Sequence, residues 1–456
     1  MDSTFIGPIV SLLFIVITAH LLLKKYNPHA VLLFSGLLML SIALVLNYKT
    51  PQLSEPSGFG GFDLFKFIKE SFVATNANVG LMIMIIGGFV AYIDKIGASK
   101  CLVHVAMKPL GLFKKYPYLA ASLVIPIGQI LFIAIPSAAG LALLLMASLF
   151  PILTNLGVSR TSAASVITAS TALGIGPASV ITASAANIVE IDAVSFFINN
   201  QIGIASILSV VMMVSYYFVN RYYDAKDPAS VEEIIEKKEE TIKAPLIYAI
   251  IPIIPIVLLI VFSELFNLFP VPITLDTTTA MIISLFIALV FEMVRTRDIK
   301  QVFSSLKIFW DGMGNIFKGV VTLIIAADIF AKGLISLGFI NGLLELSLNL
   351  GLNAAGIIIV MTIMIFLASM LMGSGNAAFF AFGPLVPKIA TKLGINSTSM
   401  ILPMQLSASM GRTVSPVAGV LIAVSEIAGV STLQIVKRNL IPLIVALLTM
   451  LCFEII

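Results

Sequence analysis

The stretch SASMGRTVSP, residues 407–416, places hydroxyl and glycine residues and one arginine inside an otherwise apolar segment. A glycine followed closely by a proline interrupts a membrane helix, and the backbone groups freed there must face protein or a cavity. A comparable stretch, STALGIGPAS, occupies residues 170–179 in the first half of the chain. The two stretches predict one discontinuous helix in each half.

The surrounding composition is that of a membrane protein. Of 456 residues, 59% are hydrophobic and only 11% are charged. Apolar runs of about 20 residues, the length that spans a bilayer, recur from Phe5 to Phe453. We expect an all-α polytopic protein with about ten full crossings plus two hairpins. Residues 4–23 have no basic flank or cleavage site and are expected to form the first span.

Several function classes lose support. The net charge of +4 comes from Lys and Arg in short loops, which is typical of cytoplasmic loops rather than of a nucleic-acid surface. Cys101 and Cys452 lie far apart, and the three histidines have no ligand spacing. No phosphate loop, HExxH or GxSxG motif is present. We therefore expect no catalytic residues, no metal, no cofactor and no nucleic-acid partner.

The two halves follow one plan, in which a hairpin precedes the broken helix. Three residue pairs at the hairpin tip and the helix break are separated by the same 237 positions: Ser137 and Ser374, Ser170 and Ser407, and Gly174 and Gly411. Repeats with interruptions at matching positions point to the binding site of a transporter.

The expected domains follow from this repeat. The first repeat has a scaffold part, 1–116, and a transport part, 117–222, made of hairpin 117–157, broken helix 159–189 and helix 193–221. A charged cytoplasmic linker, 223–244, is expected to be a solvated connector. The second repeat has a scaffold part, 245–350, and a transport part, 351–456, made of hairpin 351–394, broken helix 396–427 and helix 435–453. Within the first scaffold part we expect a short interfacial helix at 62–69 and a span at 78–107.

Basic residues set the orientation. If Lys24 is cytoplasmic, ten crossings place nearly all basic loops inside, invert the two halves and put both termini in the periplasm. Lys388 and Lys392, at the end of the second hairpin, are the exceptions. Each hairpin arm of about 18 residues is roughly 27 Å long, so two ordinary spans joined by a surface turn are an alternative. The hairpin tips carry no charge, which favours re-entrant hairpins.

Arg412 is the residue that points to a substrate. No Asp or Glu occurs from Gly351 to Ser425, and an unpaired Arg inside the membrane is costly. The simplest partner is an anionic substrate, although a snorkelling or structurally paired Arg remains open. We expect Arg412 to lie in the break itself, with Pro177 and Pro416 in the first turns of the two second half-helices.

Neutral donors around the breaks and hairpin tips complete the expected site. Half-helix N-termini, hydroxyl groups and closely approaching glycine backbone can all face an anion. Packing by small residues, and capping at the tips, are the alternatives. The candidate substrate-binding residues are Ser137, Ala138, Thr171, Gly174, Gly176, Pro177, Ser179, Thr182, Ser374, Gly375, Asn376, Ser409, Gly411, Arg412, Thr413 and Ser415. Two intramembrane acids, Asp94 and Asp328, could relay protons or pair with Lys95 and Lys332.

The segments IPSAAG at 135–140, GIGP at 174–177 and MGSGN at 372–376, together with 407–416, resemble the DcuC family of anaerobic C4-dicarboxylate carriers. The resemblance covers essentially the whole chain. It implies membership of the ion transporter superfamily, whose members are typically dimers in which a transport domain moves like an elevator against a scaffold.

The resemblance also implies a function in the bacterial inner membrane. DcuC-type carriers export succinate, exchange fumarate for succinate, and take up dicarboxylates with protons. Succinate, fumarate, malate and aspartate are the expected substrates, and protons or sodium the coupling ions. Sodium-coupled relatives carry Ser-Asn-Thr at both hairpin tips. Here the tips are PSA at 136–138 and SGN at 374–376, which favours proton coupling or plain exchange.

Our hypothesis is a secondary active C4-dicarboxylate transporter in which Arg412 binds one carboxylate. The other carboxylate would lie near Ser137 and residues 174–179. A cation/proton antiporter using Asp94 or Asp328, or a carrier of another small organic anion, is the alternative. An enzyme is not expected, because the candidate site has no nucleophile paired with a base.

Overall fold

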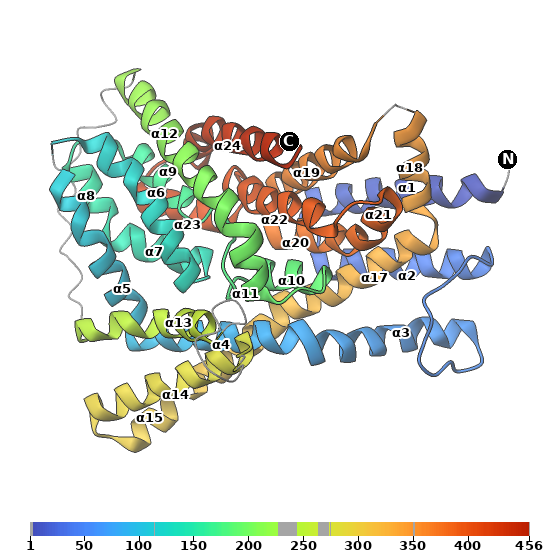
Figure 1. Cartoon of the computed structure of the whole chain (residues 1–456), viewed down its shortest axis with the longest axis horizontal. Helices are drawn as coiled ribbons and strands as arrows, with labels where there is room; N and C mark the ends of the chain where they lie inside the picture. Colours follow the sequence, from blue (N-terminus) through green and yellow to red (C-terminus); the bar gives the residue numbers. More distant parts are fainter. Residues whose placement is uncertain are drawn as a thin grey trace.

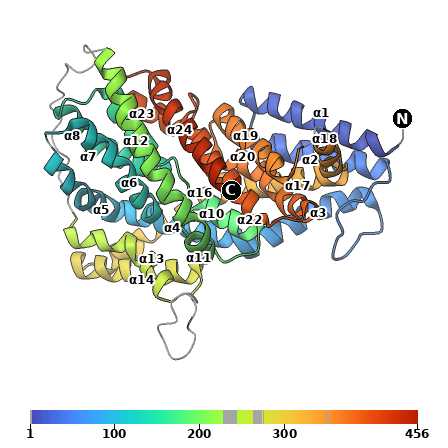
Figure 2. The same cartoon turned by 45° about the horizontal axis from the view of Figure 1, so that its top comes forward.

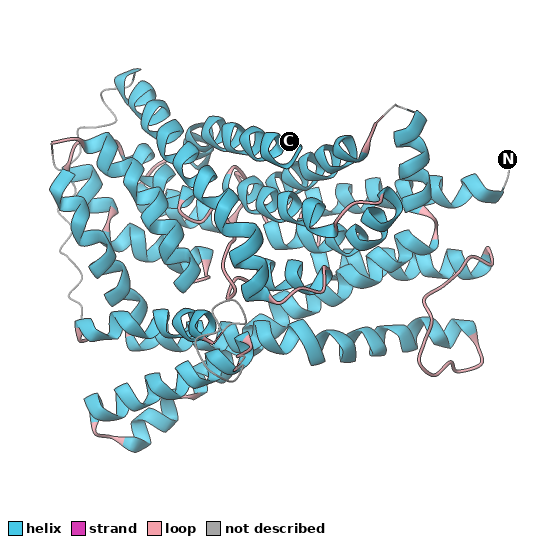
Figure 3. Ribbon diagram, in the orientation of Figure 1, coloured by secondary structure: helices cyan, strands magenta, loops and turns pink. Residues whose placement is uncertain are grey.

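The computed structural model describes residues 3–113, 115–226, 244–262, 273, 275–349 and 352–455. Within these ranges every regular element is a helix, and no strand occurs (Figure 3). Seven of the described helices are long and apolar enough to cross a membrane, or eight if one bent pair is counted as a single span. This confirms an all-helical multi-pass membrane protein.

The first part of the chain forms long helices that differ from the expected boundaries. They are α1 (Ser3–Leu23), α2 (Pro28–Val45), α3 (Gly60–Thr75), η1 (Asn76–Gly80), α4 (Leu81–Ile96) and α5 (Ala98–Met107). We expected an interfacial helix at 62–69 and a separate span at 78–107. This division was wrong, because no break separates the two segments. The chain stays helical from α3 through the π-helical η1 into α4. It then bends by 75° at Gly97, whose φ of 84° ends α4.

The first hairpin and broken helix follow a short connector. The elements are η2 (Lys108–Phe113), α6 (Pro117–Ala134), α7 (Ala138–Ser148), α8 (Phe150–Asn155), α9 (Arg160–Ala169), α10 (Val180–Ile188), α11 (Ala193–Phe196), η3 (Phe197–Gln201) and α12 (Ile202–Lys226). Ser137 caps α7, because its hydroxyl accepts from the Gly140 N–H at 3.2 Å.

The second half presents the same succession of a hairpin, a divided helix and a long helix. Its elements are η5 (Leu246–Ile253), α13 (Ile254–Val261), α14 (Thr277–Thr296), α15 (Ile299–Ser305), α16 (Lys307–Ile316), η6 (Phe317–Val321), α17 (Thr322–Ser336), α18 (Phe339–Asn349), α19 (Ala354–Met372), α20 (Gly375–Phe382), η7 (Gly383–Leu385), α21 (Val386–Leu393), α22 (Ser397–Thr413), α23 (Gly419–Ala428) and α24 (Thr432–Ile455). Ser374 caps α20 as Ser137 caps α7, with 3.2 Å to the Ala377 N–H.

The second helix break lies later than expected. Helix α22 continues to Thr413, so Gly411 and Arg412 belong to its last turn rather than to the break. The two prolines were also placed wrongly. Pro177 and Pro416 each lie three residues before the first residue of α10 or α23, outside the helix. Each proline therefore shapes the approach to a helix instead of occupying its first turn.

Close packing of small residues brings the long helices together. A Cβ on Gly36 of α2 would lie 2.7 Å from the backbone of Ile329 in α17, and one on Gly333 would lie 3.0 Å from the Gly36 carbonyl. Such contacts between small residues let the backbones of two membrane helices pack directly against each other. In both views α1, α2 and α18 lie at one end and α5 to α8 at the other, with α10 and α22 between them (Figures 1 and 2).

A buried ion pair ties α12 to α24. Arg438 Nη1 lies 2.7 Å from Asp224 Oδ1, and both side chains are buried. Asp224 also accepts from the hydroxyls of Ser159 and Ser162, next to the start of α9. Asp224 was expected in the solvated linker, and this was wrong, because it lies in the last turns of α12. Residues 227–243 of that linker lie outside the described residues.

Candidate functional site

A cavity of about 370 Å³ lies where the two hairpin tips and the two divided helices meet α4 and α16. Its lining comes from α4, the α6–α7 tip, the start of α10, α16 with η6, α20 and α22. Both halves of the chain therefore contribute to one cavity. The lining residues with polar or charged side chains are Asp94, Ser137, Ser179, Asn315, Asn376, Ser409 and Arg412.

Arg412 reaches the cavity from the last turn of α22. Its Nη2 donates to the Thr171 carbonyl at 2.5 Å, in the break that follows α9. The guanidinium has five N–H donors, and this is its single hydrogen bond within the part of the chain that the structure describes. It forms no ion pair of 4.0 Å or less there either. The half-buried Arg412 thus keeps unused donors, and no Asp or Glu of the described residues forms an ion pair with it.

The first turns of three helices line the same cavity. They contribute Ala138, the first residue of α7, Val180, the first residue of α10, and Asn376, the second residue of α20. Helix N-termini carry unpaired N–H groups and the positive end of the helix dipole. Together with Arg412 they make the cavity suited to an anion.

One acid shares the cavity with Arg412. Asp94, near the end of α4, lines it and accepts a hydrogen bond from Ser99. A Cβ built on Gly140 would lie 3.7 Å from Asp94 Oδ2, so the carboxylate lies close to the first turn of α7. No ion pair links Asp94 to Lys95 within the described residues, so the expected pairing was wrong. Asp94 was expected inside the membrane but not at this site.

Asp328 lies elsewhere. It accepts from Ser71 at 3.3 Å and does not line the cavity. The described residues include no ion pair of 4.0 Å or less between Asp328 and Lys332, although Lys332 is one helical turn away.

Two buried glutamines that the sequence did not reveal brace the wall of the cavity. Gln405 Nε2 donates to the Gly174 carbonyl at 2.5 Å, and Gln201 Nε2 donates to Gln405 Oε1 at 2.8 Å. Gln201 Oε1 accepts from the Gly176 N–H at 3.1 Å, and Thr182 joins both amides. Both glutamines are fully buried. They bind the freed backbone of the first break to α22.

The structure brings seven of the sixteen candidate residues to the cavity wall. These are Ser137, Ala138, Gly174, Ser179, Asn376, Ser409 and Arg412. The others pack, cap or brace behind it. They are Thr171, Gly176, Pro177, Thr182, Ser374, Gly375, Gly411, Thr413 and Ser415.

Two of these glycines have structural roles. Gly176 has a φ of 98°, a conformation that L side chains rarely adopt. A Cβ on Gly411 would lie 2.3 Å from the Phe366 carbonyl, so Gly411 lets α22 pack on α19. Neither residue lines the cavity, so neither brings its backbone to a ligand there.

Taken together, the fold and this cavity define a multi-pass helical membrane protein of the transporter class. The fold is similar to that in the crystal structure of the Alcanivorax borkumensis YdaH transporter. The TM-score is 0.59 at 15% identity, and the match covers 94% of this chain and 98% of that one. At this identity the likeness concerns the fold alone.

The family follows from sequence. Residues 6–456 match the family described as DcuC, C4-dicarboxylate anaerobic carrier. The chain is 34% identical over 445 residues to the anaerobic C4-dicarboxylate transporter DcuC of Escherichia coli strain K12, covering 97% of this chain and 95% of the relative. A Vibrio cholerae protein, named "Probable anaerobic C4-dicarboxylate transporter DcuC", is 33% identical over 453 residues, or 99% and 98% of the two chains. The chain belongs to the DcuC family, whose named members are transporters and not enzymes.

Proposed function

We propose that this protein is a secondary active carrier of C4-dicarboxylates in the bacterial inner membrane, and that Arg412 binds one substrate carboxylate. The observation that carries the proposal is the guanidinium of Arg412, which faces the 370 Å³ cavity without an ion pair to any described acid. A carboxylate on Arg412 would form charge-assisted hydrogen bonds and neutralise the charge. Family membership supplies the substrate class.

The second carboxylate would lie against the neutral donors. Ser137 and the first turns of α7, α10 and α20 supply hydroxyl and N–H groups on the same cavity. These donors can hold an anion without a second formal charge. Such a site suits succinate, fumarate, malate and, with its added ammonium group, aspartate.

The direct test is uptake of labelled succinate into proteoliposomes. Replacing Arg412 with Ala is expected to lower uptake at least a hundredfold, and Arg412→Lys to restore part of it. Arg221→Ala is the matched control, because Arg221 is exposed on α12 and bonds only Tyr217 in the described structure. Each variant must keep the elution profile and melting temperature of the wild type. Unchanged uptake by a folded Arg412→Ala variant would refute the proposed role.

We infer that net uptake is coupled to protons at Asp94. Asp94 and Arg412 are the charged residues of the described cavity lining. Asp94 and Lys95, the next residue, are both exposed, and they form no ion pair of 4.0 Å or less in the described structure. An ionised Asp94 would repel an arriving dianion, whereas a protonated Asp94 would remove one of the negative charges. Exchange of one dicarboxylate for another would need no net proton movement.

The pH dependence separates this coupling from the alternative. Wild-type net uptake is expected to rise as the external pH falls, and Asp94→Asn, which is permanently neutral, should lose that dependence while keeping fumarate/succinate exchange. Asp328→Asn is the control. A cation/proton antiporter would instead show cation-driven proton movement that dicarboxylates do not affect. A wild-type pH dependence in the Asp94→Asn variant would exclude Asp94 as the coupling group.

We further infer two inverted repeats, re-entrant hairpins and an elevator-type motion. The repeated order of elements and the matching caps of α7 and α20 support the repeat. Asp94 and Asn315 lie on helices of the expected scaffold parts, whereas Arg412 lies on the expected transport part. Sliding of the transport part would then separate the two walls of the cavity. The homodimer and periplasmic termini remain part of this proposal.

A further inference from the structure

A larger cavity, of about 740 Å³, lies at the end of α17. Its wall is formed by the loop after α2, the end of α17, the start of α18 and one face of α21, with Pro8 and Phe67 at its edges. Val320 lines the candidate substrate cavity and Lys332 lines this one. Lys332 lies twelve positions after Val320 along one helical run, a rise of about 18 Å. The two cavities share no lining residue.

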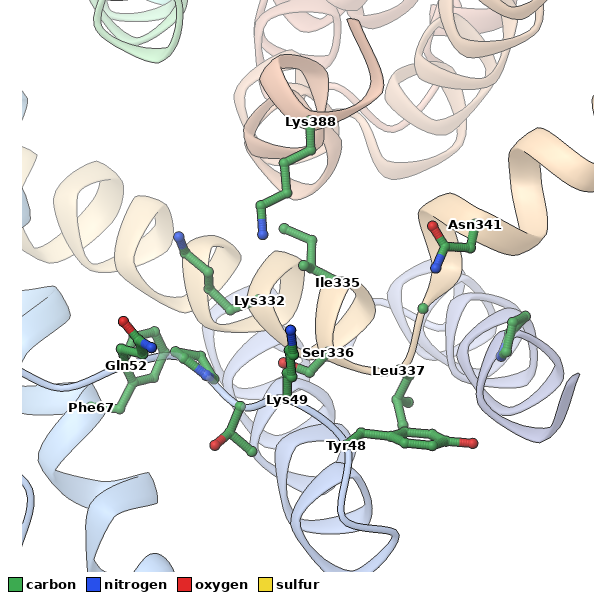
Figure 4. Close-up of a pocket in the computed structure, with 14 residues that line it drawn as sticks. Tyr48, Lys49, Gln52, Phe67, Lys332, Ile335, Ser336, Leu337, Asn341 and Lys388 are labelled. Atoms are coloured by element: carbon green, nitrogen blue, oxygen red, sulfur yellow. The ribbon is translucent and has the colours of Figure 1, made fainter. Parts of the chain in front are cut away.

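Three lysines converge on this larger cavity. Figure 4 shows the side chains of Lys49, Lys332 and Lys388 reaching into the same space from the loop, α17 and α21. No Asp or Glu lines it among the described residues. Lys392, one turn beyond Lys388 on α21, bonds Asn341, which also lines the cavity. Like charges brought together without a counter-charge repel each other.

The acids nearest in sequence are engaged elsewhere. Asp328, one turn before Lys332, accepts from Ser71 at 3.3 Å. Glu70, three residues after Phe67, accepts from the Ser54 N–H at 3.3 Å. In the part of the chain that the structure covers, none of the three lysines makes an ion pair of 4.0 Å or less. Among the described residues, Asp328 interacts with Lys332 only beyond ion-pair distance, so the three lysines lack a directly paired acid.

Membrane orientation does not explain why α21 carries the basic residues Lys388 and Lys392. Lys388 and Lys392 are the residues that depart from the positive-inside pattern in the expected topology. Orientation signals thus give no reason for basic residues on α21. A binding role would explain Lys388. Lys49 and Lys332, which lie on two other elements, would share that role.

We propose that this cavity is a second anion site, which binds a compact, multiply charged phosphate or carboxylate group. Lysine ammonium groups act as strongly hydrated point charges that suit phosphate, and Asn341, Ser336 and Gln52 supply neutral donors on the same wall. The group can be a free anion or the headgroup of an anionic lipid. Its occupant joins α21 to α17 and to the loop after α2, and so stabilises one placement of α21.

The test measures thermal unfolding of the purified full-length protein, with inorganic pyrophosphate as the probe at constant ionic strength. Occupation of the site is expected to raise the unfolding midpoint by about 2 °C or more. The double variant Lys332→Gln/Lys388→Gln should lose this shift. The control Lys300→Gln/Lys307→Gln, which removes two lysines of α15 and α16 that line neither cavity, should keep it.

A second arm distinguishes the two sources of the anion. The same proteins are placed in nanodiscs of phosphatidylcholine alone or with one-fifth phosphatidylglycerol. Stabilisation by phosphatidylglycerol that needs Lys332 and Lys388, and that pyrophosphate competes away, would assign a lipid headgroup. A shift with pyrophosphate alone would assign a free anion. Equal responses of the wild type and the double variant to both probes would overturn the proposal.

Four further variants keep the result interpretable. If the double variant fails to fold, the single variants Lys332→Gln and Lys388→Gln should each weaken pyrophosphate binding, and Lys388→Arg should retain it. Arg412→Ala should keep the full pyrophosphate shift, since Arg412 lines the other cavity. Failure of dicarboxylate transport and failure of this second site are therefore distinguishable.

Discussion

Gln201 and Gln405 bridge the first helix break to α22 through their side-chain amides. Each amide has a donor and an acceptor engaged, and the groups they satisfy include the Gly174 carbonyl and the Gly176 N–H. A buried polar group without a partner costs about 1–3 kcal/mol. The glutamines thus keep the break open and ordered, which in turn fixes the position of Gly174 on the cavity wall.

Replacing Gln405 with Leu should destabilise the protein by about 1–3 kcal/mol, because it removes the amide hydrogen bonds to the Gly174 carbonyl and from Gln201, leaving Thr182 as their remaining shared partner. The apparent KM for succinate should rise as the wall of the cavity loosens. Gln129→Leu is the matched control, because Gln129 is also buried but donates only to Met212 Sδ at 3.6 Å. Equal effects of the two substitutions on KM would argue against a bracing role for Gln405.

Arg412 could be singled out from sequence because a lone charge in a long apolar region has a large energetic cost. Gln201 and Gln405 could not, since a neutral amide is common in membrane helices and these two glutamines, which bond each other, lie 204 residues apart in the sequence. Asp94 was visible as an intramembrane acid. Its place at the site depends on how α4 packs against α7, which no local pattern records.

At the scale of elements, the buried pair of Asp224 and Arg438 joins α9, α12 and α24. Removing one member leaves an uncompensated buried charge, which costs about 3–5 kcal/mol. We expect Asp224→Asn to lower the melting temperature strongly. Adding Arg438→Met should recover part of the loss, because no charge then remains buried.

The surface pair of half-buried Lys66 and exposed Glu55, 3.9 Å apart, is the control for that experiment. Glu55→Gln should change stability by less than about 1 kcal/mol, since water screens exposed pairs. A similar effect of Asp224→Asn and Glu55→Gln on the melting temperature would contradict a structural role for the buried pair.

Hairpin tips and the existence of both breaks could be predicted, because glycine, proline and capping serines mark them in the sequence. The boundaries could not. Helix α22 runs on through Gly411 and Arg412, where Gly411 packs against the Phe366 carbonyl of α19. Likewise α3 and α4 form one helical run because nothing local stops the helix before Gly97.

At the scale of the whole molecule, the proposed elevator motion requires α21 to move past α18. Lys392 and Asn341 join these helices through their side chains. In a Cys452→Ser background, which leaves only the buried Cys101, the pair Lys392→Cys/Asn341→Cys should be linked by a short, reducible thiol cross-linker. Linking should reduce succinate transport at least tenfold, and reduction should restore it.

Each single-cysteine variant, treated with the same reagent, controls for modification alone. Complete cross-linking with full transport would mean that α21 and α18 stay together during the cycle. The helical membrane class could be predicted from sequence, whereas this contact between distant segments emerges only in the fold.

Counterflow of labelled succinate tests the central claim most directly. Proteoliposomes preloaded with unlabelled succinate or fumarate are expected to accumulate external label transiently above equilibrium. Preloading with butyrate, which has one carboxylate, should give none, and neither should the Arg412→Ala variant with any preload. Equal counterflow with butyrate and succinate, or none with any dicarboxylate, would contradict the assignment of this protein as a C4-dicarboxylate carrier.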